Sequence, residues 1–160
     1  MPLVAAVALL QSSVAPYFSV GGVTFDLVLI GAVLWGINYG PAYALVWVAV
    51  GGVLDVFGGL PWGSSMLALL PAALLTLTAR ASVVESRVLL TIGVVTTGTL
   101  AAGIIRMLIA ASLGAPTDVT QVAGFILLPQ MLANAFLACL LLPLVGGRSQ
   151  RRGLPWLAHE

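Results

Sequence analysis

The chain has 160 residues, of which 61% are hydrophobic and only 7% are charged, and its formal net charge at pH 7 is +1. A soluble domain carries about a quarter charged residues, so this chain has too few to cover a surface that faces water. The composition therefore excludes an ordinary soluble domain and predicts one all-α integral membrane domain. No nucleic-acid partner is expected.

Residues that commonly carry chemistry are sparse. The single cysteine, Cys139, lies inside an apolar run, and the single histidine, His159, is next to the last residue. No group of residues has the spacing of metal ligands, and the Ser64-Ser65 pair has no nearby histidine to activate it. We therefore expect no metal, no cofactor and no catalytic residue, and interpret the chain as non-enzymatic.

Six apolar segments predict six short transmembrane helices, because short breaks rich in glycine, proline or charge separate them. The first segment has no Lys or Arg before its apolar core and is followed by more membrane segments. It is therefore interpreted as a retained helix, not a cleaved signal. The expected helices are 2–18, 25–38, 42–57, 62–79, 88–113 and 119–145, with a cytoplasmic tail over 146–160.

The second segment, 25–38, is short for a membrane span. Its 14 residues would extend about 21 Å, less than the roughly 30 Å hydrocarbon core. Either it is partly embedded in protein, or it forms a shallow hairpin with the third segment. A five-helix alternative would merge these two through Gly40-Pro41, but proline disfavours a continuous helix there. Pro71 and Pro129, inside the fourth and sixth segments, are expected to kink them.

The arginines set the expected topology. With six helices and a cytoplasmic N-terminus, five arginines fall in cytoplasmic connections, whereas the outer connections hold no Arg and include Asp118. This is the positive-inside pattern, and it places both termini in the cytoplasm. The expected topology anchors, which could also contact anionic lipid, are Arg80, Arg87, Arg148, Arg151 and Arg152.

Three further charges fall inside the membrane. In this topology Asp26, Asp55 and Arg106 all occupy its outer half, and a buried charge there is tolerated when it is paired and faces the bundle interior. We expect Arg106 to pair with Asp55, with Asp26 or with both, since a guanidinium has five N–H donors. Asp26 also suits an N-cap of the second helix.

Asp55 is harder to explain, because it lies near the C-terminus of the third helix, where the helix dipole disfavours an anion. Two interpretations of the charged cluster stay open. It is either a structural ion pair that locks the third helix to the fifth, or the polar floor of an outward-facing pocket or partner groove. Such a pocket would take an unknown small ligand or lipid.

Small residues mark the expected close contacts and turns. Gly36-x-x-x-Gly40 and Ala68-x-x-x-Ala72 have the spacing that lets two helices approach each other. In the stretch from Gly51 to Gly63, the glycines before Asp55 suggest close packing and those after it a tight turn. The expected packing and turn residues are Gly36, Gly40, Pro41, Gly52, Gly58, Gly59, Pro61 and Gly63.

These motifs resemble those of the rod-shape-determining protein MreD family. The resemblance covers residues 25–79. It consists of Asp-Leu opening the second segment, Gly-Pro at the next turn, a glycine three residues before an aspartate, and a Pro-x-Gly turn. In this chain these are Asp26-Leu27, Gly40-Pro41, Gly52 with Asp55, and Pro61-Trp62-Gly63.

The resemblance implies a non-enzymatic scaffold or regulator of the elongasome, which builds lateral peptidoglycan and maintains rod shape in bacteria. It implies direct binding to MreC and indirect connection to RodA, a penicillin-binding transpeptidase and MreB. The implied location is the bacterial cytoplasmic (inner) membrane, as a multi-pass protein. The outer ends of the helices near Asp55 and Trp62 are the expected MreC contact.

The implied fold is similar to the S-component of energy-coupling-factor transporters. This supplies the alternative function, a vitamin-binding transporter subunit. S-components dock their coupling subunit through alanines four residues apart in the first helix. None of the alanines in the first segment here, Ala5, Ala6, Ala8 and Ala15, has that spacing. The outer connections are also short for a lid over a captured vitamin, so the scaffold is preferred.

Overall fold

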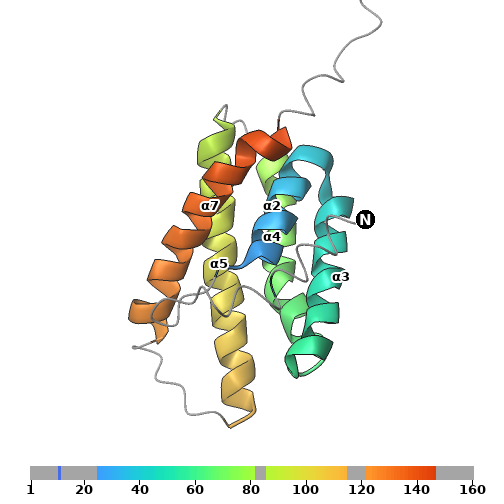
Figure 1. The fold of residues 1–160 in the computed structure, drawn as a ribbon, viewed down its shortest axis with the longest axis vertical. Coiled ribbons are helices and arrows are strands. Elements are labelled where there is room, and N and C mark those ends of the chain that lie inside the picture. Colours follow the sequence, from blue (N-terminus) through green and yellow to red (C-terminus); the bar gives the residue numbers. More distant parts are fainter. Residues whose placement is uncertain (1–10, 12–24, 82–85, 115–121, 147–160) are drawn as a thin grey trace, which may run out of the picture.

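The computed structural model describes Gln11 and residues 25–81, 86–114 and 122–146. Within these ranges the chain is all-helical, with five α-helices and a π-helical segment that directly precedes the last of them (Figure 1). In chain order the elements are α2 (Leu27–Tyr39), α3 (Pro41–Gly58), α4 (Ser64–Ala81), α5 (Arg87–Ser112), the π-helical η2 (Val122–Leu127) and α7 (Leu128–Gly146).

The expected count of six helices is wrong for the described part of the chain, which holds five α-helices. The helix expected over residues 2–18 lies outside the described residues except for Gln11, which is helical, and the tail after residue 146 also lies outside them. The other five expected segments are all helical. The expected separation of the second and third segments is confirmed against the five-helix alternative, because Gly40, with φ 123°, separates α2 from α3.

Local chemistry explains where the helices begin and end. The side chain of Asp26 caps α2, and Pro41 occupies the first position of α3, where its missing N–H has no helical partner. α3 ends at Gly58, and the next residue, Gly59, caps it with φ 65°, the left-handed conformation that glycine adopts without strain. The side chain of Ser86 caps α5. The candidate site lies beside the start of α2 and the end of α3.

The last predicted helix changes type partway along. Residues 122–127 form the π-helix η2, and Pro129 is the second residue of α7. Proline has no N–H for the α-helical bond to the carbonyl four residues earlier, and the wider π turn directly precedes it. Pro129 therefore marks a change from π- to α-helix, whereas Pro71 and Pro143 lie inside α4 and α7.

Helix α2 forms the centre of the bundle. Residues 28–34 and Gly36 are buried, and α2 contacts α3, α4, α5 and α7. Of the two options for the second segment, embedding in protein is confirmed. α2 has 13 residues against 26 in α5, so it extends along only about half of α5 (Figure 1). Its N-terminus consequently lies partway along the bundle, and α2 does not fill the space beyond it.

Small residues bring the helices close together, as the spacing predicted. A Cβ placed at Gly36 would lie 2.7 Å from the side chain of Thr76 in α4. A Cβ at Gly98 of α5 would lie 2.9 Å from the Cβ of Ala72 in α4. Of the predicted Gly36 and Gly40 pair, only Gly36 is a helix-packing contact, because Gly40 forms the turn between α2 and α3.

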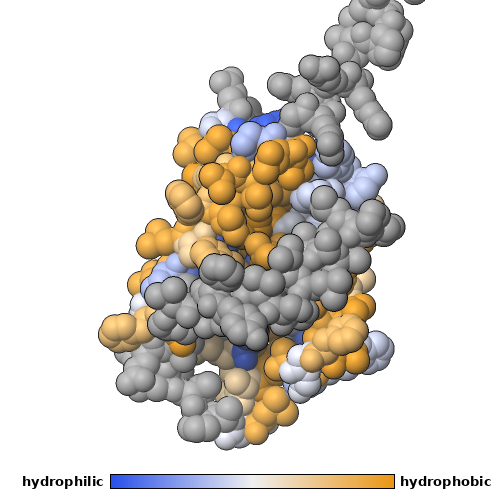
Figure 2. Space-filling model, in the orientation of Figure 1, coloured by the Kyte–Doolittle hydropathy of each residue, from blue (hydrophilic) through white to orange (hydrophobic). Residues whose placement is uncertain are grey.

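Three helical stretches are long and apolar enough to cross a membrane: Pro41–Gly58, Arg87–Ser112 and Gly124–Val145. Leu27–Tyr39 and Ser64–Arg80 are shorter apolar helices. Apolar residues cover much of the described surface in Figure 2, and hydrophilic residues gather at its upper end. These three stretches have the length and composition that a multi-pass membrane protein requires.

The connections expected in the cytoplasm lie at one end of the bundle, the upper end in Figure 1. Arg87 donates a hydrogen bond to the side-chain oxygen of Asn38 at 3.4 Å, and the Tyr39 hydroxyl donates to the Val145 carbonyl at 3.2 Å. The α2–α3 turn, the start of α5 and the end of α7 are therefore neighbours. Arg80 and Arg87 lie at this end, while the anchors expected at 148, 151 and 152 lie outside the described residues.

Candidate functional site

The carboxylate of Asp55 joins the end of α3 to the start of α4. It accepts hydrogen bonds from the backbone N–H of Gly63 at 3.0 Å and from that of Ser65 at 3.1 and 3.0 Å. The side chain is fully buried. Asp55 therefore lies at the unfavourable end of one helix dipole and the favourable end of the next, and its bonds satisfy N–H groups at the start of α4.

The turn that Asp55 closes is built from the predicted glycines. A Cβ at Gly51 would lie 2.6 Å from Leu69, and one at Gly52 would lie 2.6 Å from the sulfur of Met66. The glycine pair thus lets α3 approach α4 closely, as predicted. After Asp55, the predicted turn residues reverse the chain: Gly59 and Gly63 have φ of 65° and 90°, and the Pro61 carbonyl accepts from the Ser64 hydroxyl at 2.6 Å.

Arg106 of α5 pairs with Asp26 and not with Asp55. Its Nη2 atom lies 2.7 Å from Oδ2 of Asp26, whose Oδ1 accepts from the backbone N–H of Leu29 at 3.0 Å. Both roles predicted for Asp26, helix cap and ion-pair partner, are therefore present. The described ion pair joins α5 to the start of α2, so the predicted lock between the third and fifth helices is wrong.

Sequence reasoning missed the amides that surround this ion pair. Asn134 of α7 is fully buried, accepts a hydrogen bond from the backbone N–H of Asp26 at 3.0 Å, and donates to Thr99 of α5 at 3.2 Å. Gln11 accepts from the N–H of Leu27 at 2.9 Å and donates to the carbonyl of residue 25 at 3.0 Å. These bonds satisfy the backbone where α2 begins, inside the bundle.

A sequence signal for this amide cluster existed. Gln130 and Asn134 are four residues apart in an otherwise apolar segment, and this spacing places both on one face of a helix. A buried polar face in a membrane helix normally turns toward protein or a cavity. Both residues are buried, with Gln130 8% exposed and Asn134 fully enclosed. The periodicity of α7 therefore indicated which face turns inward.

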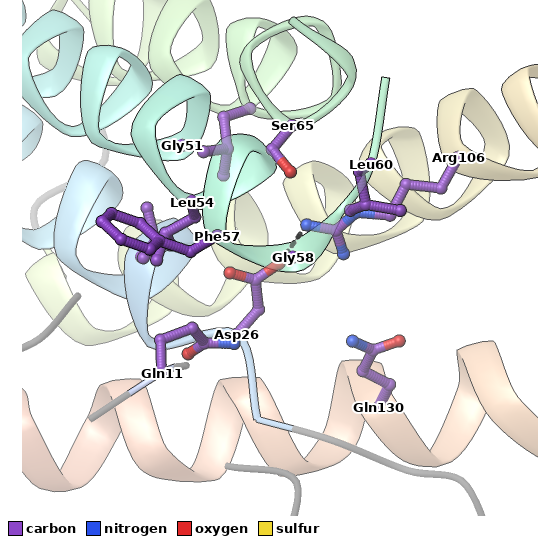
Figure 3. Close-up of a pocket in the computed structure, with 12 residues that line it drawn as sticks. Gln11, Asp26, Gly51, Leu54, Phe57, Gly58, Leu60, Ser65, Arg106 and Gln130 are labelled. Carbon is purple, nitrogen blue, oxygen red and sulfur yellow. Dashed lines mark hydrogen bonds and ion pairs between the residues drawn. The ribbon is translucent and has the colours of Figure 1, made fainter. Parts of the chain in front are cut away.

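Gln130, together with Asp26 and Arg106, lines a cavity of about 310 Å³ beyond the N-terminus of α2, which we name the polar cavity (Figure 3). Arg106 enters it from α5, Gln130 from α7 and Ser65 from α4, while the turn that ends α3 forms the apolar wall. The cavity exists because α2 begins partway along the bundle. Its lining residues are Gln11, Asp26, Val28, Gly51, Leu54, Phe57, Gly58, Leu60, Ser65, Leu69, Arg106 and Gln130.

Trp62 does not point into this cavity, and it lies apart from Asp26 and Arg106. Its side chain is 83% exposed and lines a shallow groove of about 420 Å³ on the outside of α3 and α4. We name this the α3–α4 groove; it is lined by Ala49, Gly52, Val53, Val56, Phe57, Trp62 and Met66. The structure thus separates the predicted site residues into a buried polar cluster and an exposed apolar face.

Among the described residues, no group of three or more His, Cys, Asp or Glu side chains could hold a metal ion. The described polar cluster contains amides, hydroxyls and one ion pair, which suit hydrogen bonding. No protein-family model, curated protein or solved structure matches the chain.

Proposed function

We propose that this chain is a non-enzymatic membrane scaffold of the MreD type, a multi-pass protein of the bacterial inner membrane. One observation supports the proposal most. Asp26, the Gly40-Pro41 turn, Gly52 with Asp55, and the turn at Gly63 carry the resemblance, and each holds a helix end or helix contact in the described bundle. A chain that works by presenting helix faces to partners needs these positions to be fixed.

The proposed partner is MreC, whose single transmembrane helix would dock along the α3–α4 groove. The groove is lined by exposed apolar side chains at Val53, Val56, Phe57 and Trp62. In lipid, helices associate by close van der Waals packing, which such exposed side chains can provide. Through MreC the scaffold would reach RodA, its transpeptidase and MreB.

Burial changes the part that Asp55 takes in this proposal. Because the Asp55 side chain has no exposed surface, it cannot itself touch a partner. Its role is to hold the turn that presents Trp62, through its bonds to Gly63 and Ser65. The earlier expectation that Asp55 is a direct MreC contact is therefore replaced by a positioning role, while Trp62 keeps its place in the proposed contact.

Co-purification with MreC from membranes tests the docking face. The variant to test combines Trp62→Ala with Val56→Ala, which shortens two side chains that line the groove. We expect this pair to reduce MreC capture at least several-fold, because it removes two exposed apolar contacts. The control is Phe136→Ala, which removes an aromatic side chain of α7 that is 71% exposed, against 83% for Trp62. Equal capture by all variants would remove the groove from the proposal.

The alternative, a small-molecule-binding S-component, is favoured by the polar cavity beside Asp26 and Arg106. An S-component must also bind a coupling subunit, whereas a scaffold of the MreD type must bind MreC. Pull-down with each candidate partner therefore separates the two functions. Capture of a transporter coupling subunit, together with uptake of a vitamin in cells, would support the alternative over the scaffold.

A further inference from the structure

We infer that the polar cavity binds the phosphodiester headgroup of a membrane phospholipid. Arg106 and Gln130 would hold the phosphate oxygens, and the apolar wall formed by the end of α3 would contact the acyl chains. The inference rests on the membrane location in the proposed function but not on MreC binding. It follows from hydrogen-bond donors that have no partner among the described residues, and from a cavity lining that is polar on one side and apolar on the other.

Arg106 has more donors than its protein partner uses. A guanidinium carries five N–H donors, and the described bond to Asp26 uses one of them. The Arg106 side chain is 41% exposed, whereas that of Asp26 is only 7% exposed. The guanidinium therefore faces Asp26 on one side and presents free N–H groups on another. This planar arrangement suits a second oxyanion, such as a phosphate bound through two oxygens.

Gln130 supplies further hydrogen-bond donors to the cavity. The residue is 8% exposed, and its side-chain amide has no hydrogen bond to any described residue. In Figure 3 the amide points away from α7 toward the cavity that Arg106 also enters. No buried side-chain nitrogen or oxygen among the described residues lacks a hydrogen bond, so the Gln130 amide reaches accessible space in the cavity, where it can donate to a ligand or to water. The Ser65 side chain lines the same space.

The charge of the cavity selects among oxygen-rich ligands. Asp26 balances the positive charge of Arg106, and the buried Asp55 nearby is held by backbone N–H groups. A cavity without excess positive charge disfavours a dianion such as a phosphate monoester. A phosphodiester carries one negative charge and still offers two unesterified oxygens to Arg106 and Gln130. Among phosphate groups, these charges therefore disfavour a doubly charged monoester more than the singly charged diester found in membrane phospholipids.

The apolar side of the cavity favours an amphiphilic ligand, such as a lipid, over a ligand that is wholly water-soluble. Leu54, Phe57 and Leu60 line it at the end of α3, and Phe57 is 78% exposed while Leu60 is 55% exposed. These side chains continue from the polar cavity onto the outside of the bundle, where acyl chains would lie. A ligand that combines a phosphate with hydrocarbon chains would satisfy both parts, and a membrane phospholipid has this combination.

The test is native mass spectrometry of the full chain in a neutral detergent, with short-chain phosphatidylglycerol added. Diacylglycerol of equal chain length lacks the phosphate and serves as one probe. Glycerophosphoglycerol lacks the chains and serves as the other. We expect phosphatidylglycerol to be retained at least about tenfold more strongly than either probe. Equal retention of diacylglycerol would overturn the phosphate site, and equal binding of glycerophosphoglycerol would overturn the lipid assignment.

Two variants identify the residues. Gln130→Leu removes the unpartnered amide and leaves the ion pair intact, so it should fold and lose about tenfold in affinity for phosphatidylglycerol. Arg106→Gln should lose more, and its melting temperature without lipid reports any loss of fold. Asn38→Leu, an amide change at the other end of the bundle, is the matched control. Unchanged affinity in Gln130→Leu, with the protein folded, would contradict the inference.

Discussion

Both carboxylate oxygens of Asp55 accept a hydrogen bond from the backbone N–H of Ser65, at 3.1 and 3.0 Å. One buried side chain thus closes the α3–α4 turn from inside. The relationship explains why an acid tolerates the C-terminal end of α3, since its charge interacts with free N–H groups at the start of α4. It also makes the turn, and the exposed Trp62 within it, depend on a single residue.

Replacement of Asp55 tests this dependence. Asp55→Ala leaves buried N–H groups of α4 without an acceptor, and we expect a loss of about 1–3 kcal/mol in stability. Asp55→Asn keeps one acceptor oxygen and should lose less. Thermal unfolding in detergent measures both, and Thr97→Ala at an exposed position of α5 is the control. A melting temperature of Asp55→Ala equal to that of the control would contradict the role of Asp55.

The ion pair between Arg106 and Asp26 should couple α5 to the start of α2. We expect Asp26→Asn and Arg106→Gln, made singly and together, to give a coupling energy of about 1 kcal/mol. The value is modest because the Arg106 side chain is partly exposed. Asn at position 26 can still cap the helix, so the cycle isolates the charge interaction. Strictly additive losses of stability would show that the two charges do not stabilise each other.

Two glycines of α5 form a matched pair for testing helix contacts. A Cβ at Gly98 would lie 2.9 Å from the Cβ and 3.4 Å from the Cα of Ala72, so neither neighbour can rotate away. We expect Gly98→Ala to destabilise the bundle by about 1–3 kcal/mol. Nothing lies within 4 Å of a Cβ at Gly93, so Gly93→Ala should be neutral or stabilise by up to about 1 kcal/mol.

Thermal unfolding of the two glycine variants, in the same detergent, gives the comparison directly. Because both changes add one methyl group to the same helix, the difference between them reports the contact with α4 alone. Similar melting temperatures would mean that α4 and α5 are not held as closely as the Gly98–Ala72 contact requires.

Asn134 should be essential for the fold although it touches no predicted partner surface. Asn134→Leu has a similar volume but removes the acceptor for the Asp26 N–H and the donor to Thr99. We expect a loss of about 1–3 kcal/mol, because a buried N–H is left unpaired. Thr99→Ala removes only one end of the same network and should lose less. Unfolding of the two variants ranks them, and the reverse order would contradict the bridging role.

Particular residues show how far sequence reasoning reached. Gly40-Pro41 and the stretch from Gly51 to Gly63 predicted the helix ends and turns, because proline and glycine act locally on the backbone. Asp26 was identified as a cap for the same reason. The pairing of Arg106 was left between two acids, since sequence distance does not say which carboxylate shares its depth and face. The amides Gln130 and Asn134 were missed because polar residues were sought only as charges.

The sequence by itself predicted an apolar helical chain and, to within about three residues, the bounds of its described helices. Hydrocarbon-rich segments and the breaks between them are local properties, and the free energy of burying apolar segments in lipid depends chiefly on composition. The tertiary structure alone decided that α2 begins partway along the bundle, that Arg106 pairs with Asp26, and that Gln130 turns into a cavity. Such facts depend on packing between distant segments, where small residues set the distances and each buried polar group must find a partner.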